Sequence, residues 1–169
     1  MQDMSSSLPN ILFLDIDGVL CTHRACVATS NTGLSSYLDP IACLLVKNLC
    51  LDNNARIVIS SSWRSTYDQL AMRAILNSAC PALGDFTLDD IVWWCTRSWV
   101  YSDDNDNTSD RGREISHWIY NNYYKFNNLV IIDDMADMRP LQESLVRCDV
   151  YDGLGYRQYQ DAYRMLKFN

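Results

Sequence analysis

An apolar segment of strand length, which begins at Ile11, ends abruptly in Asp15 and Asp17, and Gly18 follows directly. Alternate residues of an extended chain point the same way, so both carboxylates should project together from the strand end. Neighbouring carboxylates repel one another unless a cation or a shared proton relieves the repulsion. The glycine permits a tight turn and close approach to a ligand. The segment therefore predicts a hard metal ion and a carboxylate nucleophile beside a second acid–base group.

Aspartate and glycine are also ordinary turn residues, so this motif alone fits a buried strand followed by an acidic turn equally well. The length of 169 residues favours one domain over residues 1–169, with a flexible start at residues 1–9. A hydrophobic fraction of 48% is typical of a globular protein. No apolar run approaches the roughly 20 residues of a membrane span, and the start lacks a signal-peptide pattern. We therefore expect a cytoplasmic protein without membrane contacts.

The charged residues and the cysteines narrow the function further. A formal net charge of -7 argues against a large basic surface for nucleic acid. The seven cysteines are scattered without a Cys-x-x-Cys pair, which favours reduced thiols that mostly serve as small buried hydrophobes. Zinc is not expected, because neither His23 nor His117 stands at ligand spacing from a cysteine.

Apolar strands and amphipathic helices alternate along the chain. The strands are expected at 10–15, 56–60, 91–95, 128–133 and 147–151. The first helix is expected to begin at Asp39-Pro40, with an apolar face of Ile41, Leu44, Leu45 and Leu49. A second helix is expected over 66–79, where Thr66 and Gln69 form a capping box. Two further helices are expected, one from Asp110 after a polar loop at 101–110 and one over 156–166. Because most strands are apolar throughout, we predict a Rossmann-like α/β fold with a central parallel sheet flanked by helices.

Polar side chains follow three of these strands. Asp15 and Asp17 follow the first strand, Ser60 the second, and Asp133 and Asp134 the strand at 128–133. The carboxyl ends of parallel strands lie at one edge of a sheet, where open α/β sheets bind ligands. We therefore expect these side chains to form one site.

The motifs in this order resemble the haloacid dehalogenase (HAD) superfamily of phosphohydrolases over roughly residues 10–166. The matching segments are Phe-Leu-Asp-Ile-Asp-Gly-Val-Leu, Ile-Val-Ile-Ser and Val-Ile-Ile-Asp-Asp. Residues 59–64 (Ile-Ser-Ser-Ser-Trp-Arg), 111–115 (Arg-Gly-Arg-Glu-Ile), 132–135 (Ile-Asp-Asp-Met) and the Gly153-Leu154 turn resemble the branch named for Swiss Army Knife RNA repair proteins. That branch is related to the phosphatase half of polynucleotide kinase-phosphatases.

The resemblance and the chemistry of the residues imply the same roles. Asp15 would attack phosphorus and form an aspartyl-phosphate, while Asp17 would serve as general acid and then as general base. Mg²⁺ would be held by Asp15, the carbonyl of Asp17 and Asp133, with Asp134 bound through water or orienting the site.

The phosphoryl oxygens need hydrogen-bond donors and a cation. Ser60 and nearby backbone N–H groups would supply donors. Arg111 matches the cationic third motif best, and Arg113 is the alternative. The remaining candidates for substrate binding are Ser61, Arg64, Arg113 and Gly18.

Several residues near these motifs allow two interpretations. Trp63 could stack on a base or pack in the core, and Arg64 could grip a phosphate or pair with an acid at the surface. His23 and Arg24 could line the entrance or lie in an exposed loop. A tryptophan group at 93, 94 and 99 favours packing. A calcium loop at 103–114 is not expected, since Thr108 stands where glycine is required.

We therefore predict a magnesium-dependent phosphatase with a small or absent cap, because the segments between the motifs are only a few dozen residues long. The substrate would be a nucleotide or other phosphorylated small molecule, or a nucleic-acid 3′-phosphate end. A catalytically silent protein that binds a phosphorylated ligand or partner is the alternative, although none of the expected aspartates is missing. A phospho-accepting receiver domain fits poorly, because its phosphoacceptor follows a middle strand, where this chain has Ser60.

Overall fold

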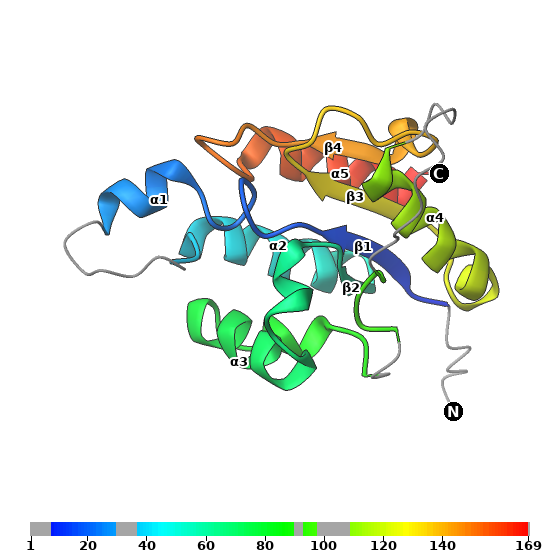
Figure 1. Ribbon diagram of the computed structural model, residues 1–169, viewed down its shortest axis with the longest axis horizontal. Helices are drawn as coiled ribbons and strands as arrows, with labels where there is room; N and C mark the ends of the chain where they lie inside the picture. Colours follow the sequence, from blue (N-terminus) through cyan, green and yellow to red (C-terminus); the bar gives the residue numbers. More distant parts are fainter. Residues whose placement is uncertain (1–7, 30–36, 90–92, 98–108, 169) are drawn as a thin grey trace.

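A computed structural model describes residues 8–29, 37–89, 93–97 and 109–168 of the chain. Its centre is a four-stranded sheet in the order β2-β1-β3-β4, and every neighbouring pair is parallel. The strands are β1 (Asn10–Leu14), β2 (Ala55–Ile59), β3 (Leu129–Asp133) and β4 (Leu145–Arg147). This arrangement confirms the predicted Rossmann-like α/β fold with a parallel sheet flanked by helices (Figure 1).

Helices cover both faces of the sheet. The α-helices are α1 (His23–Ala28), α2 (Pro40–Asp52), α3 (Gln69–Ala79), α4 (Asp110–Asn122) and α5 (Tyr156–Phe168). Short 3-10 helices are η2 (Ser62–Ser65), η3 (Gly84–Phe86), η4 (Tyr123–Lys125) and η5 (Gln142–Ser144). Figure 1 shows α4 on one side of the sheet and α2 and α5 on the other.

Alternation along the strands divides the core into two clusters. Leu12 and Leu14 of β1 belong to the larger cluster, which contains residues of α2, α3 and α5. Ile11 and Phe13 point to the opposite face and pack with residues of α4, including Trp118, whose ring meets Phe13 edge-on at 5.2 Å. Both faces of β1 are therefore buried, which is why the strand is apolar throughout.

The apolar face of α2 differs from the prediction. The prediction of Asp39 as N-cap is confirmed, because its side chain accepts hydrogen bonds from the N–H groups of Ile41 and Ala42. Ile41 and Leu44, however, are exposed. The buried residues are Ala42, Cys43, Val46, Leu49 and Cys50. The small side chains of Ala42 and Cys43 allow α2 to pack closely against its neighbours. These two residues therefore belong to the buried face in place of Ile41 and Leu44.

Two helix starts also differ. Asp68, and not Thr66, caps α3 by accepting from the N–H of Ala71. Ser109, and not Asp110, caps α4 by accepting from the N–H of Gly112. Each true cap lies within two residues of the predicted one and has the extended backbone that an N-cap requires.

The last strand and the predicted strand at 91–95 need correction. β4 begins two residues before the predicted segment 147–151 and overlaps it only at Arg147. Tyr151 lies in an exposed turn. Residues 90–92 lie outside the described part, and Cys95 forms a single bridge to Ile59 in place of a strand. The predicted loop at 101–110 lies mostly outside the described residues, as does Trp99, whereas Trp94 is buried.

Two residues of the predicted flexible start at 1–9, Leu8 and Pro9, form hydrogen bonds with a later part of the chain. The carbonyls of Leu8 and Pro9 accept hydrogen bonds from the side chain and the backbone of Asn127. Residues 1–7 lie outside the described part. Within that part, the insert between β1 and β2 adds the six-residue α1 beyond the strand ends, which fits a small or absent cap (Figure 1). None of the described helices is long and apolar enough to cross a membrane.

All seven cysteines are free, and four of them are buried, as predicted for small hydrophobic residues. Burial raises the pKa of the thiols of Cys43, Cys50 and Cys148 to about 12. These thiols are therefore neutral and unreactive at neutral pH.

Candidate active site

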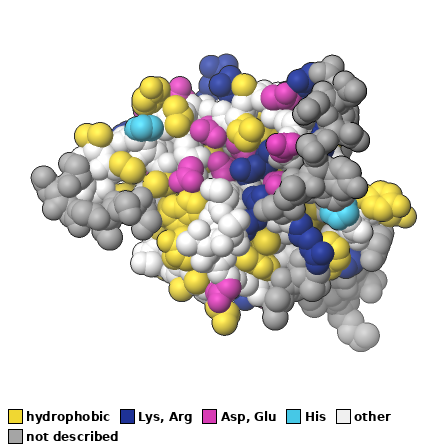
Figure 2. Space-filling view, viewed as in Figure 1, with side chains coloured by type: hydrophobic (Ala, Val, Ile, Leu, Met, Phe, Trp, Pro, Cys, Tyr) yellow, Lys and Arg dark blue, Asp and Glu magenta, His cyan; other side chains and the backbone are white. Residues whose placement is uncertain are grey.

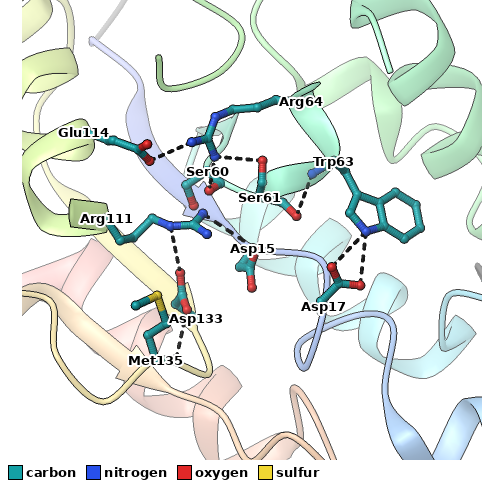
Figure 3. Close-up of polar contacts among 10 residues, drawn as sticks. All are labelled: Asp15, Asp17, Ser60, Ser61, Trp63, Arg64, Arg111, Glu114, Asp133 and Met135. Carbon is teal, nitrogen blue, oxygen red and sulfur yellow. Dashed lines mark hydrogen bonds and ion pairs between the residues drawn. The ribbon is translucent and has the colours of Figure 1, made fainter. Parts of the chain in front are cut away.

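The carboxyl ends of β1, β2 and β3 bring together the polar residues that the motifs predicted. Asp15 follows β1, Ser60 follows β2, and Asp133 is the last residue of β3. All three are buried, and they lie close together in Figure 3. Figure 2 shows acidic and basic side chains gathered near the middle of one face of the molecule. The parallel sheet therefore creates the predicted cluster at a single edge.

Three of the aspartates are arranged as a possible metal centre. Asp15, Asp133 and Asp134 each offer a carboxylate oxygen, and these oxygens lie within 4.8 Å of one another. Oδ2 of Asp133 is buried without a hydrogen-bond partner among the described residues. Hard oxygen ligands bind Mg²⁺ in preference to soft metal ions. Oδ2 of Asp133, which lacks a hydrogen bond within the described part of the chain, could coordinate such an ion. The donor set therefore fits the predicted magnesium ion.

The same arrangement disturbs the ionisation of Asp15. Burial and the nearby charge of Asp133 raise the pKa of Asp15 to about 7, although Arg111 and a hydrogen bond from Ser61 act in the opposite direction. Burial also raises the pKa of Asp133. A positive ion beside both groups would favour their charged forms.

Arg111 is the cation that the structure places beside these carboxylates. Its Nη1 lies 3.7 Å from Oδ1 of Asp15, and its Nε lies 4.0 Å from Oδ2 of Asp133. Nη1 is buried without a hydrogen-bond partner among the described residues, so a donor remains to be used. Arg113 stands two positions later in α4, about 200° around the helix, and cannot point in the same direction.

Backbone packing fixes the position of the first turn of α4, which carries Arg111. Gly112 lies so close to the carbonyl of Arg139 that a Cβ would collide with it. The side chain of Ser109 caps the helix in front of Arg111. A cation near the positive end of a helix is unfavourable by itself, so the two carboxylates must offset this cost.

Ser60 and Ser61, the first two residues after β2, are fully buried. Ser60 donates its N–H to the carbonyl of Leu14 at 2.9 Å, while its hydroxyl has no hydrogen-bond partner within the described segments. The Ser61 hydroxyl hydrogen-bonds Asp15 and accepts from the N–H of Trp63 at 3.3 Å. An orphaned hydroxyl at this edge is a donor that an anion could accept from.

Gly18 is required by both backbone and space. Its φ of 72° lies in the left-handed region, and a Cβ there would collide with the carboxylate of Asp134. The turn carries Asp17 into an exposed position, where both of its carboxylate oxygens accept from the indole N–H of Trp63. Trp63 is half-buried and packs against the main core, which agrees with the core interpretation. Stacking of Trp63 on a base stays a prediction.

Arg64 pairs with an acid, as one of its two interpretations predicted, but the pair is buried and does not lie at the surface. Its side chain is only 8% exposed, and its guanidinium lies 2.7 Å from the carboxylate of Glu114. It also donates to the carbonyls of Ser60 and Ser61 at 2.6 and 2.8 Å (Figure 3). The arginine therefore ties the loop after β2 to α4, one turn along the helix from Arg111. Direct contact between Arg64 and substrate stays a prediction.

Replacing Glu114 by glutamine is expected to lower the free energy of unfolding by about 3 kcal/mol, because it removes a buried anionic partner of Arg64. Denaturant unfolding of the two proteins measures this difference. Asp161→Asn is the control, since its ion pair with Arg164 is largely exposed and should contribute little. Equal destabilisation by the two substitutions would contradict the structural role of the buried pair.

His23 and Arg24, which could line the entrance or lie in an exposed loop, are both exposed and lie at the start of α1. His23 begins α1, and its ring centroid lies 5.1 Å from that of Tyr151. Arg24 pairs with Asp39, the cap of α2, at 2.7 Å. Sequence reasoning missed the roles of Trp63 and Glu114, because their partners lie 46 and 50 residues away in the chain.

Comparison with known proteins agrees with the geometry. The model of the family described as "HAD domain in Swiss Army Knife RNA repair proteins" matches residues 11–158. No curated protein and no solved structure matches the chain. The match includes both strand-end aspartate pairs, the serines after β2 and Arg111. The chain therefore belongs to the family of HAD domains found in Swiss Army Knife RNA repair proteins.

Proposed function

We propose that this protein is a Mg²⁺-dependent phosphomonoester hydrolase that acts through an aspartyl-phosphate on Asp15. Membership of a HAD family supports phosphatase chemistry of this type. The observation that carries the proposal is the surroundings of Asp15: a buried carboxylate with Arg111 at 3.7 Å and two further aspartates at metal-binding distance. A carboxylate nucleophile needs positive charge to approach an anionic phosphate. Among the described residues, the guanidinium of Arg111 lies beside Asp15, and the three aspartates could hold a metal ion.

The orphaned polar atoms indicate where the phosphate would bind. Nη1 of Arg111 and the hydroxyl of Ser60 are both buried without hydrogen-bond partners among the described residues. In a complex with substrate they would donate to the phosphoryl oxygens while Asp15 attacks phosphorus. Donors that are already oriented toward developing negative charge are the usual source of such catalysis.

Asp15, Asp133 and Asp134 would hold the magnesium ion, and the carbonyl of Asp17 would complete the protein ligands. The ion would offset the repulsion between the nucleophile and the phosphate. Asp17 would first protonate the leaving oxygen and then take a proton from the water that attacks the aspartyl-phosphate.

The substrate class follows from the family and from charge. The family description refers to RNA repair, so a nucleotide or a nucleic-acid phosphate end is the proposed substrate. The net charge of -7 favours contact with a nucleotide or a chain end over extended nucleic acid.

Phosphate release with Mg²⁺ across a substrate panel tests the proposal. The panel contains an aryl phosphate, mononucleotides, and oligonucleotides with 3′- or 5′-phosphates. We expect turnover that needs Mg²⁺ and prefers a nucleotide or an oligonucleotide end. Binding of these ligands without any release of phosphate would contradict an enzyme and favour a silent phosphate-binding protein.

A further inference from the structure

Trp63 makes an unusual contact with the proposed acid–base residue. Its indole Nε1 lies 3.1 and 3.0 Å from the two carboxylate oxygens of Asp17 (Figure 3). The contact joins the turn after β1 to η2, the 3-10 helix after β2. An indole has one N–H and can only donate, so both oxygens share a single charge-assisted hydrogen bond. This contact fixes the direction in which the Asp17 side chain points.

The tryptophan is itself held on several sides. Its backbone N–H donates to the hydroxyl of Ser61, and its carbonyl accepts from the N–H groups of Thr66 and Tyr67, both at 2.9 Å. The ring lies 5.5 Å from the ring of Tyr67 and packs partly against the main core. The indole is therefore a fixed donor, which is what an oriented carboxylate requires.

Asp17 stands apart from the other aspartates of the site. The carboxylates that could share a metal ion are those of Asp15, Asp133 and Asp134, and Asp17 is not among them. A carboxylate that bound the ion directly would commit the lone pairs that it needs for proton exchange. Trp63 lies on the side of Asp17 away from Asp15 (Figure 3), so its hydrogen bond opposes a movement of the Asp17 carboxylate toward the metal-binding cluster.

We propose that Trp63 is the positioning residue of Asp17 and keeps its carboxyl group outside the metal-binding cluster, where it can exchange protons with the reacting oxygens. This inference rests on the proposed function, because it assigns a part in that reaction. As an oxygen of Asp15 bonds to phosphorus and the bond from phosphorus to the leaving oxygen breaks, protonated Asp17 gives its proton to that leaving oxygen. The resulting Asp17 carboxylate then takes a proton from water as the water oxygen bonds to phosphorus. The bond between Asp15 and phosphorus breaks in this second step, which frees the Asp15 carboxylate and releases phosphate.

Trp63→Phe tests the role, because it removes the N–H and keeps an aromatic ring. The measured quantity is kcat/KM, which reports the step that expels the leaving group, for an alkyl and a nitrophenyl phosphate. An alkoxide needs a proton to leave, whereas nitrophenolate does not. We expect kcat/KM to fall about 30-fold or more for the alkyl ester and about threefold or less for the aryl ester. Tyr67→Phe, which keeps the ring beside Trp63, is the matched control and should behave as wild type on both.

Equal losses on the two esters would overturn the proposal, since they would indicate a general structural effect. A raised KM with an unchanged kcat for both would also overturn it and would favour stacking of Trp63 on substrate. Wild-type values in Trp63→Phe would show that the N–H is not needed. Thermal unfolding of Trp63→Phe checks that the variant is folded.

Nuclear magnetic resonance provides a readout that does not need turnover. The indole N–H signal of Trp63 is identified by its loss in Trp63→Phe. In Asp17→Ala this signal should shift upfield, because the proton loses its charged acceptor; an unmoved signal would overturn the contact. A wild-type protein that releases phosphate from neither ester and from no member of the substrate panel would instead overturn the proposed function and the acid–base role of Asp17. The indole signal would still decide whether Trp63 fixes that side chain.

Discussion

Asp15→Asn is expected to reduce Mg²⁺-dependent phosphate release by at least about 10³-fold, because an amide cannot serve as the nucleophile that forms the aspartyl-phosphate. Phosphate release from the preferred member of the substrate panel measures the loss. The substitution preserves the shape of a buried side chain at the end of β1, so binding of substrate should survive better than turnover.

The fold of Asp15→Asn provides the control. Asp15 and Asp133 are buried and close together, so a neutral side chain at position 15 removes a repulsion in the metal-free protein. We therefore expect the variant to unfold at a higher temperature than wild type in the presence of a chelator at neutral pH. Full phosphatase activity in a folded Asp15→Asn protein would exclude Asp15 as the nucleophile.

The second large effect concerns pH and metal. Without divalent metal, the contribution of Asp15 to the free energy of unfolding of wild type should fall as pH rises from about 4 to about 7. Asp15 has a pKa of about 7 in the folded protein against an ordinary value of 3.8, so the folded state binds the proton more tightly in this window. Stability is therefore greatest at the acidic end and is lost as the proton leaves. At about 1.4 kcal/mol per pKa unit, the change is on the order of 3 kcal/mol.

Thermal unfolding across this pH range, with a chelator and with Mg²⁺, measures the effect. The fall should be smaller in Asp15→Asn, which retains Asp133, whose pKa burial also raises. The difference between the two proteins measures the contribution of Asp15. At pH 7.5, Mg²⁺ should raise the unfolding temperature of wild type and have a much smaller effect on Asp133→Asn. An equal response of wild type and Asp133→Asn to Mg²⁺ would contradict a metal site at this edge of the sheet.

The strands and the order of the site motifs could be predicted from local pattern. β1 and β3 are buried on both faces, so their sequences are apolar throughout and end where the aspartates begin. The parallel arrangement then requires Asp15, Ser60 and Asp133 to lie at one edge. These predictions succeeded because they depend on short segments and on one general property of α/β sheets.

The errors arose where packing overrides local pattern. In α2, Ile41 is exposed although isoleucine usually prefers the core, whereas Ala42 and Cys43 are buried, because the close approach of the helix to the sheet selects small side chains. β4 could not be located from apolar character, since Val150 and Tyr151 look equally suitable for a strand. Pairing with β3 selects Leu145 and Val146, and the side chain of Asp149 accepts from the N–H of Tyr151 in the turn that follows.

The sequence by itself determined the α/β class, the strand-end aspartates and the family to which the chain belongs, because these depend on residues that are close together in the chain. Only the tertiary structure decided which side chains meet. It placed Arg111 beside Asp15, paired Arg64 with Glu114, and joined Trp63 to Asp17 across 46 residues. Such contacts depend on how distant elements pack, and no local pattern specifies the partner of a buried charge or of an indole N–H.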